Sequence, residues 1–288
     1  VGEFALVFNT TGSNNIAVGA SALENNNSAN ASIAIGTAAL ANSNISRQVA
    51  IGDSALYNLN GGSGFNTAVG ARALFASTTA QENAAFGFGS LQRTTTGNFN
   101  AAFGTSSLTN NTSGASNTAV GTNAIGKGTA ASNNTAVGTN ALNNVTTGGN
   151  NTAIGRSTLT ALTTGSSNTA IGYSANVSSA NLTNATAIGN GAVATASNQV
   201  MLGDNAVTVV RTFGTIIVPS DGRFKKNVKE NVPGLEFIRA LRPVTYNYDV
   251  HGLDNMMKTA VRKEKTLDEN MDAATETAMT EKKKKIYT

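Results

Sequence analysis

The stretch NNTAVGTNAL at residues 133–142 returns as NNTAIGRSTL at residues 150–159, seventeen positions further on. Both copies carry Thr, Ala, a β-branched residue and Gly in that order, with Leu four places after the Gly. The same local pattern at a fixed interval selects the same local structure each time. A period near twenty residues with a strand-like core is typical of a solenoid.

The Gly that closes the core marks every repeat. Successive steps between these Gly residues are 17, 16 and 18 residues, then seven steps of 17, then 14. The residue before each Gly is Val, Ile, Phe or Leu, and the one before that is Ala in eleven of the twelve repeats. We predict these structural repeat positions: Gly19, Gly36, Gly52, Gly70, Gly87, Gly104, Gly121, Gly138, Gly155, Gly172, Gly189 and Gly203.

The core favours a short strand, because it is too short for a helix and combines β-branched with small residues. In a strand, Thr67 and Val69 share one face and Ala68 and Gly70 share the other. We expect the larger pair to fill the coil interior and the smaller pair to let another backbone approach. Seventeen residues then make one coil of about two strands and two turns, and about 11–12 coils stack at ~4.8 Å.

A single coil contributes about one Val or Ile and one Leu to an interior, which is little apolar burial for the backbone that it orders. The sequence therefore predicts an obligate homo-oligomer. We expect the copies to meet through the small Ala and Gly face, with the repeat axis parallel to the symmetry axis.

The core N-T-A-[VI]-G-x-x-A-L, over residues 12–210, resembles the head repeats of trimeric autotransporter adhesins (the YadA-like head) and repeats of tail-fibre proteins. The resemblance implies left-handed parallel β-rolls packed as a homotrimer, and adhesion to a surface glycan or matrix receptor. The alternative is a monomeric, ice-binding solenoid with a flat Thr array. That array is interrupted at Ile16, Ile33, Val49, Ala84, Ala101 and Val200.

Composition excludes several classes of function. The 288 residues include no Cys and one His, His251, so we expect no disulfide, metal or cofactor. No apolar run is long enough to cross a membrane, and the first residues lack a signal-peptide pattern. Residues 1–219 carry six basic and five acidic groups without a basic stripe, so we expect no nucleic-acid partner.

The charged residues are concentrated after Pro219, where we place the main domain boundary. We predict a β-roll shaft or head at 1–203, a neck or terminal strands at 204–219, and a smaller α/β segment at 220–288. Within the last segment, 254–285 is rich in Lys, Glu, Met and Ala and is typical of a helix.

Two motifs in the last segment resemble the C-terminal intramolecular chaperone of endosialidase-type phage tailspikes. The first, S-D-x-R-x-K-x-N, is matched by Ser220, Asp221, Arg223, Lys225 and Asn227. The second, L-x-x-I-x-x-L-x-P-V-x-Y, is matched by Leu235, Ile238, Leu241, Pro243, Val244 and Tyr246. We expect 220–288 to be the N-terminal part of that domain.

The chaperone resemblance implies a trimeric assembly aid that cuts itself from the fibre. The cut would fall at Pro219–Ser220, with Ser220 as nucleophile and Lys225 as its base. A Lys can serve when burial lowers the pKa of its ammonium group. Lys226 is an alternative base. In the other interpretation, Ser220 caps a helical turn and Lys225 lies in solvent.

Two functions follow from these patterns. The first is a structural fibre or adhesin, extracellular, on a cell surface or in a phage or injection-machine tail fibre, with no external substrate. The second is a tailspike enzyme that degrades polysaccharide. Glycoside hydrolysis needs paired carboxylates, and the five acidic residues of the first part never fall in pairs within one repeat motif, which favours the fibre.

Overall fold

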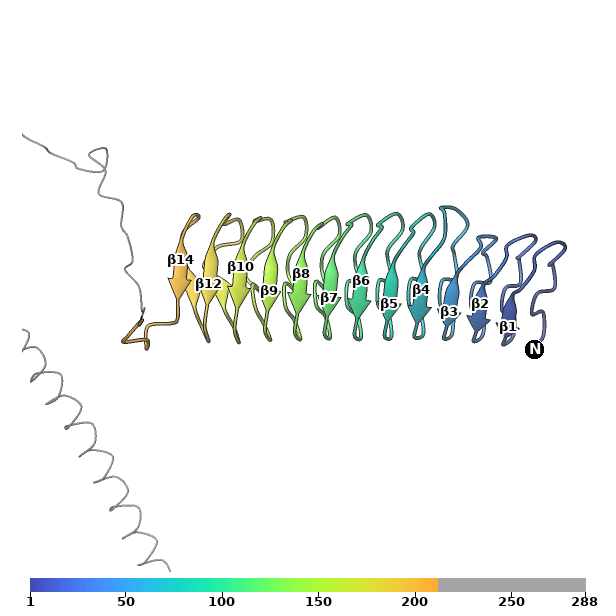
Figure 1. Cartoon of the computed structure of the whole chain (residues 1–288), viewed down its shortest axis with the longest axis horizontal. Helices are drawn as coiled ribbons and strands as arrows, with labels where there is room; N and C mark the ends of the chain where they lie inside the picture. The colour runs from blue at the N-terminus through green and yellow to red at the C-terminus, as the bar shows by residue number, and fades with distance from the viewer. Residues whose placement is uncertain (212–288) are drawn as a thin grey trace, which may run out of the picture. The chain divides into compact units, whose positions relative to one another are not determined.

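The computed structural model describes residues 1–211, which form a parallel β-solenoid. Within these residues the chain is mainly β, without a helix. Each coil places one short strand in a single 12-stranded sheet, so that the strands follow one another in a row (Figure 1). The strands are β1 Ile16–Val18, β2 Ile33–Ile35, β3 Val49–Ile51, β4 Thr67–Val69, β5 Ala84–Phe86, β6 Ala101–Phe103, β7 Thr118–Val120, β8 Thr135–Val137, β9 Thr152–Ile154, β10 Thr169–Ile171, β12 Thr186–Ile188 and β14 Val200–Leu202.

Equivalent residues pair across every step of this sheet, whatever the local period. Ala34 pairs with Ala50 across a 16-residue step, and Ala50 pairs with Ala68 across an 18-residue step. The extra or missing residues are therefore absorbed in the turns, and the strand cores stay in register.

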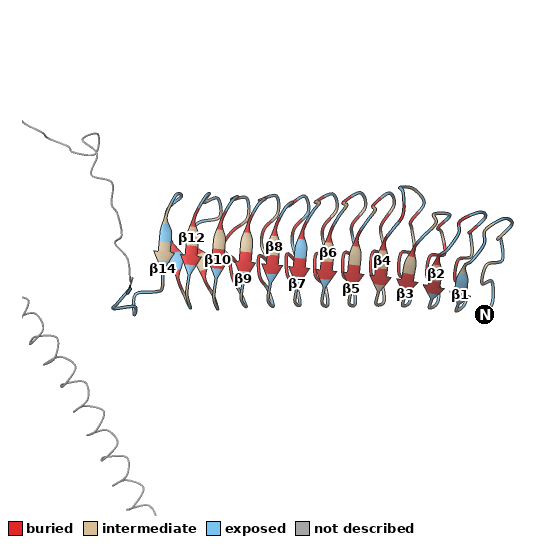
Figure 2. Ribbon diagram, in the orientation of Figure 1, coloured by how far each residue is buried: buried red, intermediate tan, exposed pale blue. Residues whose placement is uncertain are grey.

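The central Ala of the strands faces the interior. Ala68 is completely buried, whereas Thr67 and Val69 on either side are only half-buried. Our expectation that Thr67 and Val69 fill the interior was wrong. The opposite wall of most coils already supplies a buried Leu, such as Leu74, and leaves little room beside it for more than a methyl group. Figure 2 shows buried residues in the strands from β2 to β12.

The opposite wall consists of turns, so the prediction of two strands per coil was wrong for most coils. Only β11 Asn176–Val177 and β13 Val193–Ala194 form a second sheet in the described part of the chain. In the other coils, left-handed backbone recurs at every second residue of this wall, as at Arg72 and Leu74, which has a φ of 51°. Its N–H still donates to the carbonyl of Ser90 in the next coil at 3.0 Å. The turn residues thus keep neighbouring coils hydrogen-bonded without an extended strand.

Most of the buried Leu side chains, with Ile125, form one column along the solenoid, and it is the main apolar core. Each member lies four residues after a repeat Gly, and each is fully buried. The column consists of Leu23, Leu40, Leu56, Leu74, Leu91, Leu108, Ile125, Leu142 and Leu159.

A second buried column consists of amides, which we call the Asn ladder. Asn117 Nδ2 donates to Asn100 Oδ1 at 3.0 Å and to the Ala131 carbonyl at 2.7 Å. Its own Oδ1 accepts from the backbone N–H and the Nδ2 of Asn134. A buried polar side chain is stable when its donors and acceptors are partnered, as they are here. The ladder runs through Asn66, Asn83, Asn100, Asn117, Asn134, Asn151 and Asn168.

The repeat Gly follows the strand at a corner that only Gly tolerates. Gly121 has a φ of 127°, and a Cβ there would lie 2.7 Å from the backbone of Gly138. All twelve predicted repeat Gly residues have a positive φ. The corner therefore requires Gly both for its backbone conformation and for the close approach of the next coil.

The predictions for the α/β segment at 220–288, including the helix at 254–285, lie outside the described residues. So does the second half of the predicted neck, 212–219. Among residues 1–211, no helix has the length and apolar character needed to span a membrane.

Candidate interaction face

The side chains on either side of the central Ala point out of the coil and form the outer face of the 12-stranded sheet. We call the first residue of each strand the first column and the third residue the third column. The third column is apolar throughout and partly exposed: Val18 is 43% exposed, Phe103 42% and Leu202 48%. It consists of Val18, Ile35, Ile51, Val69, Phe86, Phe103, Val120, Val137, Ile154, Ile171, Ile188 and Leu202.

Such a row of exposed apolar side chains is unusual for a protein surface. Most of its members appear among the large apolar side chains that remain exposed, such as Ile35, Val120 and Ile171. The patch is continuous, because the strands are neighbours in one sheet. Contiguous apolar patches larger than a few hundred Å² are typical of interaction sites. The outer face is therefore the main candidate functional surface of the described chain.

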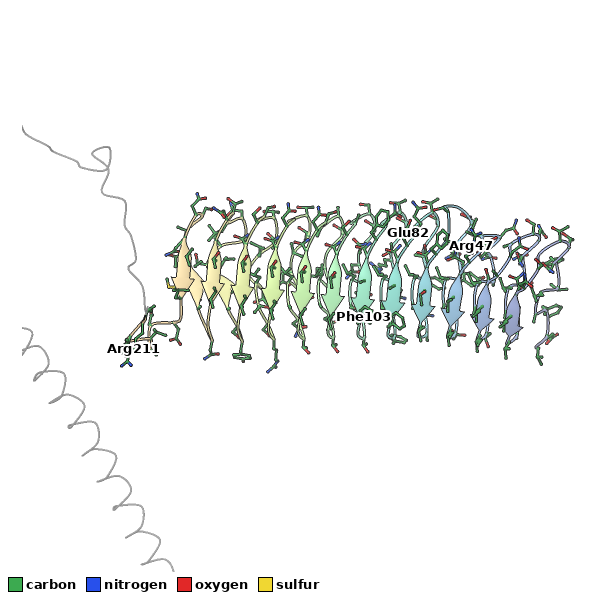
Figure 3. All side chains as sticks on the ribbon, viewed as in Figure 1. Arg47, Glu82, Phe103 and Arg211 are labelled. Carbon is green, nitrogen blue, oxygen red and sulfur yellow. The ribbon has the colours of Figure 1, made fainter. Side chains whose placement is uncertain are left out.

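Where the side chains of the third column are larger, those of the first column are smaller. From β7 to β10 each strand has Thr in the first column and Val or Ile in the third. In β5 and β6 the first column has Ala84 and Ala101, while the third has Phe86 and Phe103. The two Phe rings stack with centroids 4.9 Å apart and an interplanar angle of 5°. In Figure 3, Phe103 lies near the lower edge of the solenoid and Glu82 near the upper edge, on opposite sides of the strands.

An open pocket of about 540 Å³ lies beside the first column where the two Ala residues stand. Ala84 and Ala101 line it together with Phe65, Phe99 and Glu82. Phe65, Glu82 and Phe99 each come directly before an Asn of the ladder. All three have a positive φ and are exposed. Arg47, one coil earlier, places its guanidinium 5.5 Å from the centre of the Phe65 ring.

The pocket was not predicted from the sequence, because it combines turn residues of three coils with strand residues of the same coils. Its lining includes one carboxylate, Glu82, whereas the usual glycoside hydrolysis needs two. The signal that points to it is the paired change to Ala and Phe within two consecutive repeats. The face predicted to contact other copies, made of Ala68 and Gly70, is not available, because Ala68 is inside the coil.

The residues predicted for self-cleavage, Ser220 and Lys225, lie outside the described part of the chain. The chaperone-of-endosialidase family model matches residues 220–266, and so begins at that serine. No curated protein matches the chain. No solved structure matches it either. A β-solenoid followed by a segment that matches this family model fits a structural protein of the tail-fibre or tailspike type.

Proposed function

We propose that the chain is a homotrimeric structural fibre that presents its solenoid outside the cell for attachment to a surface glycan or matrix receptor. Its C-terminal segment assists assembly, as the chaperone-of-endosialidase match suggests. The single observation that carries the proposal is the continuous apolar third column on the outer face. Three copies packed around an axis parallel to the stacking direction would remove this column from water.

The apolar outer face explains how a solenoid with so narrow an interior becomes stable. Inside a coil, Ala68 and Leu74 supply most of the apolar contact. Covering Val69 and its equivalents adds further burial for every coil, and this contribution grows with the number of coils. The contact uses the face opposite to the one expected from the sequence, while the symmetry axis stays parallel to the repeat axis.

A charge placed in the third column tests the assembly. Val120→Lys should convert the trimer into monomers, because three ammonium groups would be brought together in a dry contact. Thr122→Lys is the matched control, since Thr122 is exposed two residues further on and lies beyond the strand. Light scattering of the full chain measures the mass. A wild-type chain that is monomeric throughout the accessible concentration range would refute the trimer.

Self-cleavage is the second part of the proposal, with Ser220 as nucleophile, Lys225 as base and Pro219–Ser220 as the bond. Wild-type chains should yield a C-terminal fragment that begins at Ser220. Ser220→Ala should abolish the fragment, because the attacking hydroxyl is lost. Lys226→Ala serves as the control for Lys225→Ala, and intact-mass spectrometry reports each product. Unchanged cleavage in Ser220→Ala would exclude this residue as the nucleophile.

A further inference from the structure

We propose that Phe86 and Phe103 of one subunit fill the pocket over Ala84 and Ala101 of a second copy, and that this match sets the axial register of the assembly. The inference rests on the homotrimer proposed above and specifies the contact within it. Its occupant is a second copy of this chain.

The first argument is the paired change in residue size. In β5 and β6, the larger third-column residue is accompanied by a smaller first-column residue, Ala in place of Thr. In an isolated subunit the side chains of both columns face solvent. The smaller Ala residues are therefore not needed there to make space for the Phe rings. In a contact between two copies of the outer face, the added ring of one copy requires space on the other.

The second argument is geometric. A rotation about an axis parallel to the stacking direction leaves every coil at its own height. The same rotation brings the third-column edge of one copy against the first-column edge of its neighbour. The rings of β5 and β6 therefore meet the Ala residues of the same two strands in the neighbour. The pocket lies on that first-column side of the strands, since Ala84, Ala101 and Glu82 line it.

The third argument is the fit. A dry cavity of about 150 Å³ holds one benzene molecule, and the pocket volume of about 540 Å³ leaves room for two phenyl groups. Phe86 and Phe103 are already stacked in parallel at 4.9 Å, so little rotamer freedom is lost on insertion. Phe65 and Phe99 in the pocket lining offer further aromatic contact.

The contact between the Phe pair and the Ala pair selects one axial register, because the contacts of the neighbouring coils are the same in every register. Strands β7 to β10 all present Thr and then Val or Ile, so a shift of one coil replaces each contact by an equivalent one. The same shift brings a Phe ring against Thr67 or Thr118 and leaves half of the pocket unfilled. The β5 and β6 contact therefore distinguishes the aligned assembly from shifted ones.

An exchange of the two columns tests the inference on the full chain. Phe86→Ala with Phe103→Ala should weaken trimer association at least about tenfold more than Val120→Ala with Val137→Ala, since buried aromatic anchors dominate interfaces. Ala84→Phe with Ala101→Phe should also weaken it, because rings then meet rings. The quadruple variant that carries both changes should recover most of the association. Sedimentation over a range of concentrations measures each equilibrium.

The outcomes separate this inference from the proposed function. A wild-type trimer in which the Phe pair matters no more than the Val pair, or in which the exchange fails to restore association, overturns the register contact and leaves the trimer standing. A monomeric wild type overturns both. Saccharide binding to the wild-type trimer that Phe65→Ala with Phe99→Ala abolishes would show an open pocket and overturn the contact. Circular dichroism confirms that each variant keeps its β signal.

Discussion

At the scale of single residues, the solenoid repeatedly uses left-handed backbone at buried positions. Among the fully buried members of the Leu column, leucine occupies this conformation in eight coils and Ile125 occupies it in one, with a φ of 50°. A positive φ is costly for a β-branched residue. The sequence compensates at Gly128, where a Cβ would lie 2.7 Å from Ile125 Cγ2. Other coils carry a larger residue there, such as Asn111 or Val145.

Ile125→Leu should therefore stabilise the protein. Removing the branch at Cβ relieves backbone strain, which we expect to raise the free energy of unfolding by about 1 kcal/mol. The reverse change in the next coil, Leu142→Ile, should destabilise, because its added branch would press on the fully buried Val145. Thermal unfolding followed by circular dichroism compares the two variants. A lower melting temperature for Ile125→Leu would contradict the strain argument.

At the scale of elements, the Asn ladder links the coils through side chains as well as through backbone. Each amide in it is buried and bonded to the amides before and after it, as Asn117 is to Asn100 and Asn134. At the N-terminal end Gln48 takes the place of Asn, and its Oε1 accepts from Asn66. At the other end Asn168 Oδ1 accepts from the backbone N–H of Ala185. The ladder thus extends over most coils with its polar groups partnered.

Asn117→Ala should lower the free energy of unfolding by about 3 kcal/mol, because it leaves buried donors and acceptors without partners. The Ala131 carbonyl and the N–H of Asn134 lose their side-chain bonds. Thr139→Ala, on an exposed residue, is the control and should have almost no effect. Chemical denaturation of both variants gives the comparison. Equal stability would show that the ladder fills space without contributing through its hydrogen bonds.

The strand cores, their register and the Gly corners could be predicted from the sequence, because each depends on a local pattern that recurs. The orientation of the strand could not. Alternation shows that Thr67 and Val69 share a face, but it does not say which face lies inside. That choice depends on Leu74, which reaches the interior from the far wall of the coil. The pocket over Ala84 likewise arises from turns of adjacent coils, whose conformation the period does not specify.

At the scale of the described solenoid, stability is built coil by coil along one direction. Each strand contacts the strand before it and the strand after it in the sheet. In such an array, stability is close to a sum of coil and neighbour terms. Whole coils are therefore interchangeable units.

Deletion of residues 118–134 removes one coil and joins Asn117 to Thr135, which restores the repeat at the junction. The shortened chain should fold with the same β signal per residue of solenoid and a slightly lower melting temperature. Deletion of residues 118–125 should instead disrupt the stack, because it brings turn residues into a strand position. Circular dichroism and limited proteolysis distinguish the two. Loss of structure in both would show that the coils are not independent units.

The chain of amide-to-amide bonds in the Asn ladder also has a direction along the solenoid. Backbone N–H groups alternate between the previous coil and the next: Gly36 donates backward to Val18, and Leu40 donates forward to Ala55. Each ladder amide likewise donates in both directions: Asn117 Nδ2 bonds backward to Asn100 Oδ1 and forward to the Ala131 carbonyl. The bonds from amide to amide, however, all run backward, so along this chain each amide polarises the next. Parallel subunits would place these one-way chains of amides side by side, all pointing the same way along the fibre.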